Sequence, residues 1–262
     1  MSLTDELKSF LLSEGASDVG ISNLPDAVGG MSTAVSIVVR LSDAVVNEIT
    51  DKPTHTYFHH YRTVNAFLDR LSMLCGLFLQ QHGYDYIPIA ASQSVDKEYH
   101  GRYSHKKAAY FAGLGTVGKN SLFLHSVYGS RIRLATVFTD APLTAGHPLE
   151  YSLCNGCNAC VKACPAFAIT GAEWEPGIER NKLFDPAACS NYMKREFQQI
   201  GRGAVCGICM RVCPIHNSYP PAKPGVLHMR AKPCFSGGAS RRWYGLPLAK
   251  VCYLLPVNGS TY

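Results

Sequence analysis

The sequence lacks any apolar run long enough to cross a membrane, since a spanning helix needs about 20 mostly apolar residues and no stretch approaches that length. Its opening residues, MSLTDELKSFLLSEG, carry an acidic side chain at Asp5 and lack the apolar core of a secretory signal. We therefore expect a cytoplasmic protein that has no membrane partner and whose thiols stay reduced.

Acidic residues are missing from residues 215–262, although six basic residues lie there. This segment therefore carries the whole formal charge of +6. Arg241 and Arg242 directly precede Trp243 and Tyr244, so the segment can form a phosphate-binding strip with aromatic stacking, as nucleic-acid sites do. It can equally attract an acidic ferredoxin by charge alone. We favour the second interpretation, because the basic residues are spread thinly among prolines.

Cysteine, in contrast, is plentiful, and seven of the 11 cysteines fall in two short runs. The first run has the spacing C-x2-C-x2-C-x3-C-P from Cys154 to Pro165. This is the bacterial ferredoxin spacing, in which three closely spaced thiolates bind one [4Fe–4S] cluster and the fourth binds another. The second run, from Cys206 to Pro214, lacks its leading cysteine, and Cys189 can supply the missing thiol.

Crossed pairing of the two runs predicts two [4Fe–4S] clusters. The ligands of cluster I are then Cys154, Cys157, Cys160 and Cys213. Those of cluster II are Cys164, Cys189, Cys206 and Cys209.

Two other uses of the cysteines are less consistent with this pattern. Zinc ribbons also use paired C-x2-C knuckles, but they need neither a third cysteine two residues on nor a proline after the fourth. A disulfide framework is not needed, because 262 residues can bury an ordinary core. Three cysteines remain outside the runs: Cys234, Cys252 and Cys75, and the last of these lies in an apolar helical pattern and is expected in the core.

Helical and strand patterns alternate before the cysteines begin, which indicates an α/β or α+β domain over residues 1–148. We expect a double-cluster domain over 149–218 and a basic, Pro- and Gly-rich tail over 219–262. Helices are predicted for residues 4–13, 61–82 and 105–112, and strands for residues 34–41, 86–90, 122–124 and 132–138.

The stretch AGLGTVGKN, residues 112–120, partly fits two nucleotide-binding patterns. The dinucleotide string needs a strand before it and a helix after it, and here the order is reversed. The P-loop needs Ser or Thr where Asn120 stands. The plainer interpretation is a tight helix-to-strand turn whose glycines permit positive φ.

Together these motifs resemble the epoxyqueuosine reductases, distant relatives of the reductive dehalogenases. The resemblance rests on AGLGTVGKNSLF, YGSRIRLATVFTDAPL, both cysteine runs and the separated CSNY that contains Cys189, and it covers most of residues 4–218. It implies an α+β fold, with a nitroreductase-like core that binds cobalamin and a C-terminal ferredoxin-like domain with two [4Fe–4S] clusters. It also places the glycine turn at the corrinoid, which implies that Gly113, Gly115, Gly118, Lys119 and Asn120 bind this cofactor.

The resemblance further implies a cobalamin-dependent reductase fed by ferredoxin or flavodoxin, and it has two departures. The family's proton-donating aspartate stands thirteen residues before AGLG, where this chain has Tyr99, followed by His100. These two residues are the candidate proton donors, and a polar loop without chemistry is the alternative. The tRNA-modifying members continue into a helical-repeat domain, whereas we expect this chain to be a short relative without one.

Two functions from different classes follow. In the first, the chain is a reductase that uses cobalamin on a small-molecule or corrinoid substrate, with tRNA possible but not favoured. In the second, it is an electron-transfer or corrinoid-reducing partner that performs no substrate chemistry of its own. A core able to bind a corrinoid favours the first, and the loss of the family's aspartate favours the second.

Overall fold

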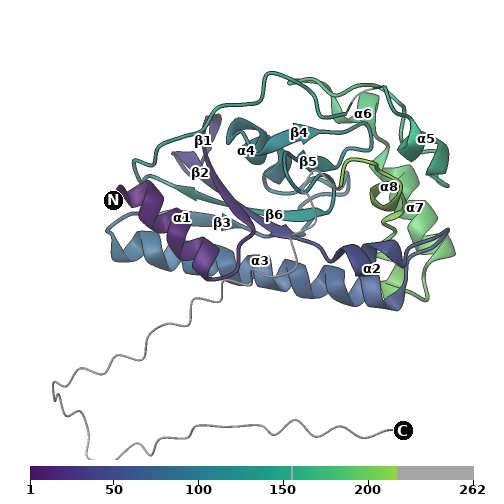
Figure 1. Ribbon diagram of the computed structural model, residues 1–262, viewed down its shortest axis with the longest axis horizontal. Coiled ribbons are helices and arrows are strands. Elements are labelled where there is room, and N and C mark those ends of the chain that lie inside the picture. The colour runs from purple at the N-terminus through teal and green to yellow at the C-terminus, as the bar shows by residue number, and fades with distance from the viewer. Residues whose placement is uncertain (155, 217–262) are drawn as a thin grey trace, which may run out of the picture. The chain divides into compact units, whose positions relative to one another are not determined.

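Four antiparallel strands form the central sheet of a computed structural model that describes residues 1–154 and 156–216 (Figure 1). Their order across the sheet is β1-β2-β6-β3. The strands are β1 (Asp18–Val28), β2 (Met31–Arg40), β3 (Tyr86–Ile89) and β6 (Ile132–Thr139). Strands β2 and β6 pair without a register shift, from Thr33 opposite Thr139 to Arg40 opposite Ile132.

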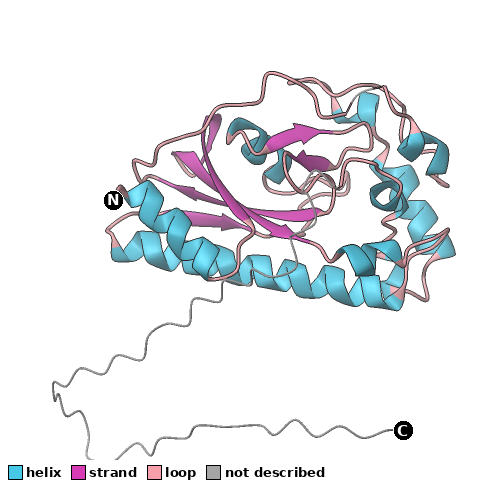
Figure 2. Ribbon diagram, in the orientation of Figure 1, coloured by secondary structure: helices cyan, strands magenta, loops and turns pink. Residues whose placement is uncertain are grey.

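Helices cover both faces of this sheet (Figures 1 and 2). One face packs against α1 (Leu3–Ser13) and α3 (His55–Gln81), and the other against α4 (His105–Phe111). Alternate residues of β2 therefore enter different hydrophobic clusters: Val35 and Ile37 join α1 and α3, whereas Ala34 and Val38 join α4. Because both faces are covered, residues 34–39 of β2 are all buried, Ser36 included, rather than buried at alternate positions.

A small hairpin follows α4 and carries the glycine turn. It consists of β4 (Gly115–Val117) and β5 (Phe123–His125), with Thr116 opposite Leu124. His125 is buried and binds Asp18 at 3.1 Å, which fixes the hairpin to β1.

Short helices make up the cysteine-rich segment, and they pack directly on the core. These helices are α5 (Ala159–Ala163), α6 (Arg180–Leu183), α7 (Pro186–Glu196), the 3-10 helix η1 (Gly201–Gly203) and α8 (Ile208–Arg211). One further short helix, α2 (Asp43–Asn47), follows β2 in the core. Phe197, Ile200 and Ile208 belong to the same hydrophobic cluster as α3. The cysteines are therefore held by a segment that shares the core's packing.

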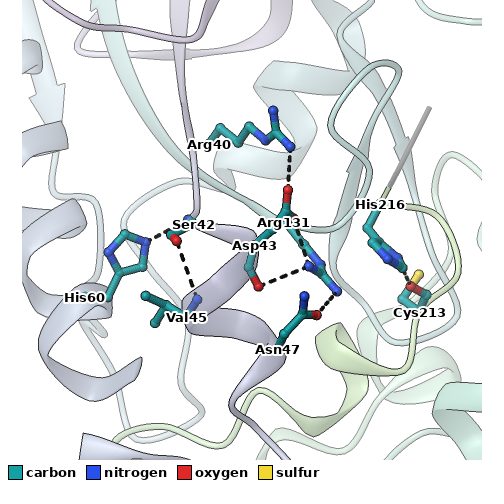
Figure 3. A network of polar contacts seen from close by, with 9 residues as sticks. All are labelled: Arg40, Ser42, Asp43, Val45, Asn47, His60, Arg131, Cys213 and His216. Atoms are coloured by element: carbon teal, nitrogen blue, oxygen red, sulfur yellow. Dashed lines mark hydrogen bonds and ion pairs between the residues drawn. The ribbon is translucent and has the colours of Figure 1, made fainter. Parts of the chain in front are cut away.

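The start of β6 is a second junction between the core and the cysteine-rich segment. The Ser130 N–H donates to the Ile215 carbonyl at 2.9 Å. The next residue, Arg131, is buried and binds Asp43 at 2.8 Å and Asn47 at 2.9 Å (Figure 3). The segment after Cys213 is thus attached to a strand end that is itself fixed to α2.

Each predicted helix and strand is present, with shifted bounds. Helix α3 begins at His55, earlier than predicted, because the Thr54 side chain caps it by accepting from the Tyr57 N–H. Strands β1 and β4 were not predicted. Cys75 is buried, as expected, and burial raises the pKa of its thiol to about 12.

The basic tail lies outside the described residues, together with Lys223, Arg230, Lys232, Arg241, Arg242, Lys250, Cys234 and Cys252. Within residues 1–154 and 156–216, no helix combines the length and the hydrophobicity that a membrane span requires.

Candidate functional site

The eight clustered cysteines line two separate cavities, which we call cavity 1 and cavity 2. Cavity 1 has a volume of about 150 Å³, and its thiols come from the loop before α5, from α5 itself and from the segment after α8. These thiols are Cys154, Cys157, Cys160 and Cys213. The last comes from the second cysteine run, so cavity 1 joins both runs.

Cavity 2 is the larger, at about 280 Å³, and holds the other four thiols. These are Cys164, Cys189, Cys206 and Cys209. Cys189 lies on α7, whose first turn is capped by the Asp185 side chain accepting from the Ala188 N–H at 2.9 Å. Gly207 has φ +83° at the start of α8, and this left-handed conformation turns the chain between Cys206 and Cys209.

Burial controls the protonation of five of these thiols. It raises the pKa of Cys189 to about 12, and the neighbouring Cys206 and Cys164 sulfurs add to the effect. Burial likewise raises the pKa values of Cys160, Cys206, Cys209 and Cys213. Such thiols are neutral at pH 7 until a metal displaces their protons, since the thiolate is the ligand.

Asn120 lines both cavities and so lies between them. Its Nδ2 donates to the Cys209 carbonyl at 3.3 Å, and its Oδ1 accepts from the Leu122 N–H at 3.1 Å. Gly118 and Lys119 line cavity 1 only. The second half of the glycine turn therefore lies against the cysteines.

The glycines of this turn are needed for packing within the chain. Only Gly113 has a positive φ, +77°, so positive φ does not explain Gly115 and Gly118. A Cβ on Gly113 would lie 2.3 Å from the His147 carbonyl oxygen, and one on Gly115 would lie 2.0 Å from that of Leu124. A Cβ on Gly118 would lie 2.9 Å from the Asn120 side-chain oxygen. The chain's own atoms thus fill the space that a side chain at Gly113 or Gly115 would need.

Tyr99 and His100 lie on a loop that borders the cysteine-rich segment, and neither is among the residues that line cavity 1 or cavity 2. His100 Nδ1 lies 2.8 Å from the Asp96 carboxylate, in an exposed pair. The Tyr99 backbone has φ +62°. A hydrogen bond with Ser190 lowers the pKa of the Tyr99 hydroxyl, and Lys194 contributes to this effect.

Cavity 2 is also lined by three basic side chains that the sequence analysis did not identify as site residues. Lys106 comes from α4, Arg133 from β6 and Arg180 from α6. Burial lowers the pKa of Lys106 to about 8, with a further contribution from Arg180. No local pattern joins residues 106, 133 and 180, so only the fold could bring them together.

Comparisons with known proteins agree with this arrangement. Residues 153–216 match the family described as "4Fe-4S double cluster binding domain", and all eight clustered cysteines lie within them. An epoxyqueuosine reductase from Cyclobacterium marinum is 34% identical over 122 residues, which are 43% of this chain and 36% of that protein. The chain thus matches about a third of the length of this curated relative.

Two solved structures share the fold at low sequence identity. A reductive dehalogenase whose title names B12-dependent dehalogenation superposes with a TM-score of 0.66 at 20% identity, over 79% of this chain and 31% of that one. An epoxyqueuosine reductase with an epoxyqueuosine-modified tRNA stem loop gives 0.53 at 20% identity, over 81% and 65%. The resemblance to epoxyqueuosine reductase-like iron–sulfur proteins is therefore confirmed, and the fold is a mixed α/β fold of this kind.

Proposed function

We propose that this chain is an iron–sulfur oxidoreductase that holds one [4Fe–4S] cluster in each cavity and passes single electrons between them. The observation that carries the proposal is the division of eight thiols, four to a cavity, with Asn120 in the lining of both. When bound, each cluster supplies a one-electron store whose potential depends on its protein surroundings. An external donor of the ferredoxin or flavodoxin type would provide the electrons.

The division of the chain follows from this role. We propose that residues 1–148 form the core domain, nitroreductase-like in its fold, and that residues 149–218 form a ferredoxin-like domain that holds the clusters. A reducing compartment such as the cytoplasm suits both domains, because the thiols must stay available for iron.

Cobalamin is the acceptor that the relatives suggest, and we keep a cobalamin-dependent reductase as the second candidate. Neither cavity 1 nor cavity 2 has room for a corrin macrocycle beside a cluster. Cavity 2, at about 280 Å³, is below the roughly 300–1,000 Å³ of pockets for drug-sized ligands, and a cluster would take part of it. We therefore derive no step through cobalamin.

The substrate class is best sought among modified tRNAs. The sequence alone favoured a non-tRNA substrate, but the relatives matched are epoxyqueuosine reductases, and one similar structure holds a modified tRNA stem loop. Tyr99 and His100 remain the candidate proton donors of such a reaction. Their loop borders α7, which carries Cys189.

A two-part experiment on anaerobically reconstituted protein tests these proposals. Iron and sulfide analysis should give about eight of each per chain, because each cluster contains four. Cobalamin is then added, and the visible spectrum is followed before and after epoxyqueuosine-containing tRNA and a reductant are supplied. Shifted corrinoid bands with loss of epoxyqueuosine would establish the cobalamin-dependent reductase. Unchanged bands together with full iron content would rule out the cobalamin-dependent reductase and leave electron transfer as the remaining function.

A further inference from the structure

The two cavities differ in the charge of the side chains that line them. Among the described residues, cavity 2 is lined by Lys106, Arg133 and Arg180 and by no Asp or Glu. Of the residues that the structure describes, Lys119 is the one Lys or Arg that lines cavity 1. The two sets of four thiols therefore lie in different electrostatic environments.

Neutral oxygens are the hydrogen-bond partners of two of the cations in cavity 2. Lys106 Nζ donates to the Ser121 carbonyl at 2.8 Å and to its hydroxyl at 2.9 Å. Arg180 Nη1 donates to the carbonyls of Glu98 and Tyr99, both at 3.1 Å. These contacts orient the two side chains and leave their charge uncompensated.

Arg133 has the same character. Its Nε donates to the Asn65 side-chain oxygen at 2.9 Å, and its guanidinium lies 4.5 Å from the centre of the Tyr61 ring. Among the described residues, no carboxylate lies within ion-pair distance of Lys106, Arg133 or Arg180. Three positive charges thus face one cavity without a protein counter-charge.

The cation of cavity 1 is partly compensated. Lys119 Nζ lies 3.6 Å from the Glu173 carboxylate and donates to Asn158 Oδ1 at 3.1 Å. The Lys119 side chain is 7% exposed, whereas Glu173 is 69% exposed, so solvent weakens this pair without removing it. Cavity 1 therefore has fewer basic side chains than cavity 2, and the charge of its lysine is partly compensated by a carboxylate.

Reduction adds one negative charge to an iron–sulfur cluster that is already anionic with its four thiolates. A nearby cation stabilises the reduced form more than the oxidised form, and the gain is larger where water is excluded. On the proposed function, we propose that Lys106, Arg133 and Arg180 raise the reduction potential of the cluster in cavity 2 above that of the cluster in cavity 1, and so set the direction of electron flow.

The transfer that follows is balanced and involves no bond change. An external one-electron carrier reduces the cluster in cavity 1, which then loses that electron to the cluster in cavity 2. Asn120 lines both cavities, so the two centres are close neighbours. Electrons collect beside α4 and β6, where an acceptor in the core would take them.

Potentiometric titration monitored by electron paramagnetic resonance tests this assignment on the reconstituted full chain. Cys213→Ala and Cys209→Ala identify which signal belongs to each cavity. In the parent protein, the cavity 2 signal should appear first on reduction. Lys106→Gln and Arg180→Gln should each lower the potential of the cavity 2 cluster. We expect each variant to lower this potential by about 59 mV, which for one electron is an about tenfold change in the ratio of reduced to oxidised cluster at a fixed solution potential.

Lys107→Gln is the matched control, because Lys107 lies on the same helix, pairs with Asp26 at 2.6 Å and lines neither cavity. It should leave both potentials unchanged. Arg133→Lys keeps the charge and should retain the potential that Arg133→Gln lowers, which separates charge from loss of packing.

A cavity 2 cluster that reduces after the cavity 1 cluster, or that keeps its potential in both glutamine variants, would overturn the inference. In that case the three cations serve another anionic group. Iron analysis separates this result from failure of the proposed function. A chain with about eight iron atoms holds two clusters, so only the inference about their potentials would be wrong, whereas a chain with fewer would not hold two clusters.

Discussion

Cavity 1 and cavity 2 contain the same number of thiols and differ in nearly everything else. Cavity 1 is the smaller, and the core contributes to its lining mainly through the glycine turn and β5. Cavity 2 is lined by side chains of α3, α4, β6 and the cysteine-rich helices, including three cations. The difference suggests a division of work, in which one cavity receives electrons and the other delivers them into the core.

The largest expected effect comes from removing a thiol that crosses between the cysteine runs. Cys213→Ala should halve the iron content, from about eight to about four atoms per chain, because it removes a ligand of cavity 1 while cavity 2 keeps four. Iron analysis with Mössbauer spectroscopy measures this. Cys209→Ala is the control and should spare the other cluster. Loss of the cavity 2 cluster in Cys213→Ala would disprove the crossed arrangement.

A smaller effect is expected at Gly115, which begins the strand β4 that carries the glycine turn. Gly115→Ala should lower the free energy of unfolding by about 1–3 kcal/mol, because the added Cβ would lie 2.0 Å from the Leu124 carbonyl oxygen. Chemical denaturation followed by circular dichroism measures the change.

Gly101→Ala is the matched control for Gly115→Ala. Its Cβ would lie 3.3 Å from the Gln93 carbonyl oxygen and 3.4 Å from that of Tyr103, which is far less crowded than 2.0 Å, so Gly101→Ala should cost less. Equal stability of the two variants would show that the turn has room beside Gly115 after all.

The pH dependence of stability should report on Lys106, the lysine of cavity 2. Burial lowers the folded pKa of Lys106 to about 8, below its ordinary value, so its protonation opposes folding. The unfolding free energy of cluster-free protein should therefore rise between about pH 8 and 10. The rise should exceed that of Lys106→Met by on the order of 1–3 kcal/mol. Urea titrations across this range measure it, and an identical pH dependence in the variant would contradict the assignment.

The smallest effect is expected at the exposed partner of Lys119. Glu173→Gln removes the carboxylate 3.6 Å from Lys119 Nζ and should raise the potential of the cavity 1 cluster slightly. Potentiometry at low salt detects this, and added salt should reduce the difference between the parent and the variant. A fall in potential would show that Glu173 does not compensate Lys119.

The sequence predicted the parts of this arrangement that depend on local patterns. Cysteine spacing assigned the same two groups of four that line the cavities, because ferredoxin runs exchange their fourth ligands. The apolar period of α3 and the position of Gly83 placed the end of that helix. Strand β1 was missed because Gly20 and Pro25 interrupt it, although an edge strand tolerates both.

Other parts depend on contacts between distant segments, and these could not be read from the chain. The cations of cavity 2 come from α4, β6 and α6 and have no shared motif. The glycine turn was assigned to positive φ, whereas two of its three glycines are needed because the backbone of β5 or the Asn120 side chain lies against them. The sequence pattern predicted a turn here, but only tertiary packing explains why Gly115 and Gly118 are glycines.

Iron-57 Mössbauer spectroscopy of the anaerobically reconstituted parent protein, combined with metal and sulfide analysis, tests the central claim most directly. We predict that all bound iron is present as [4Fe–4S] clusters, at about eight iron and eight sulfide per chain. A protein that binds zinc, or that saturates at about four iron atoms while all eight cysteines are intact, would contradict the two-cluster account.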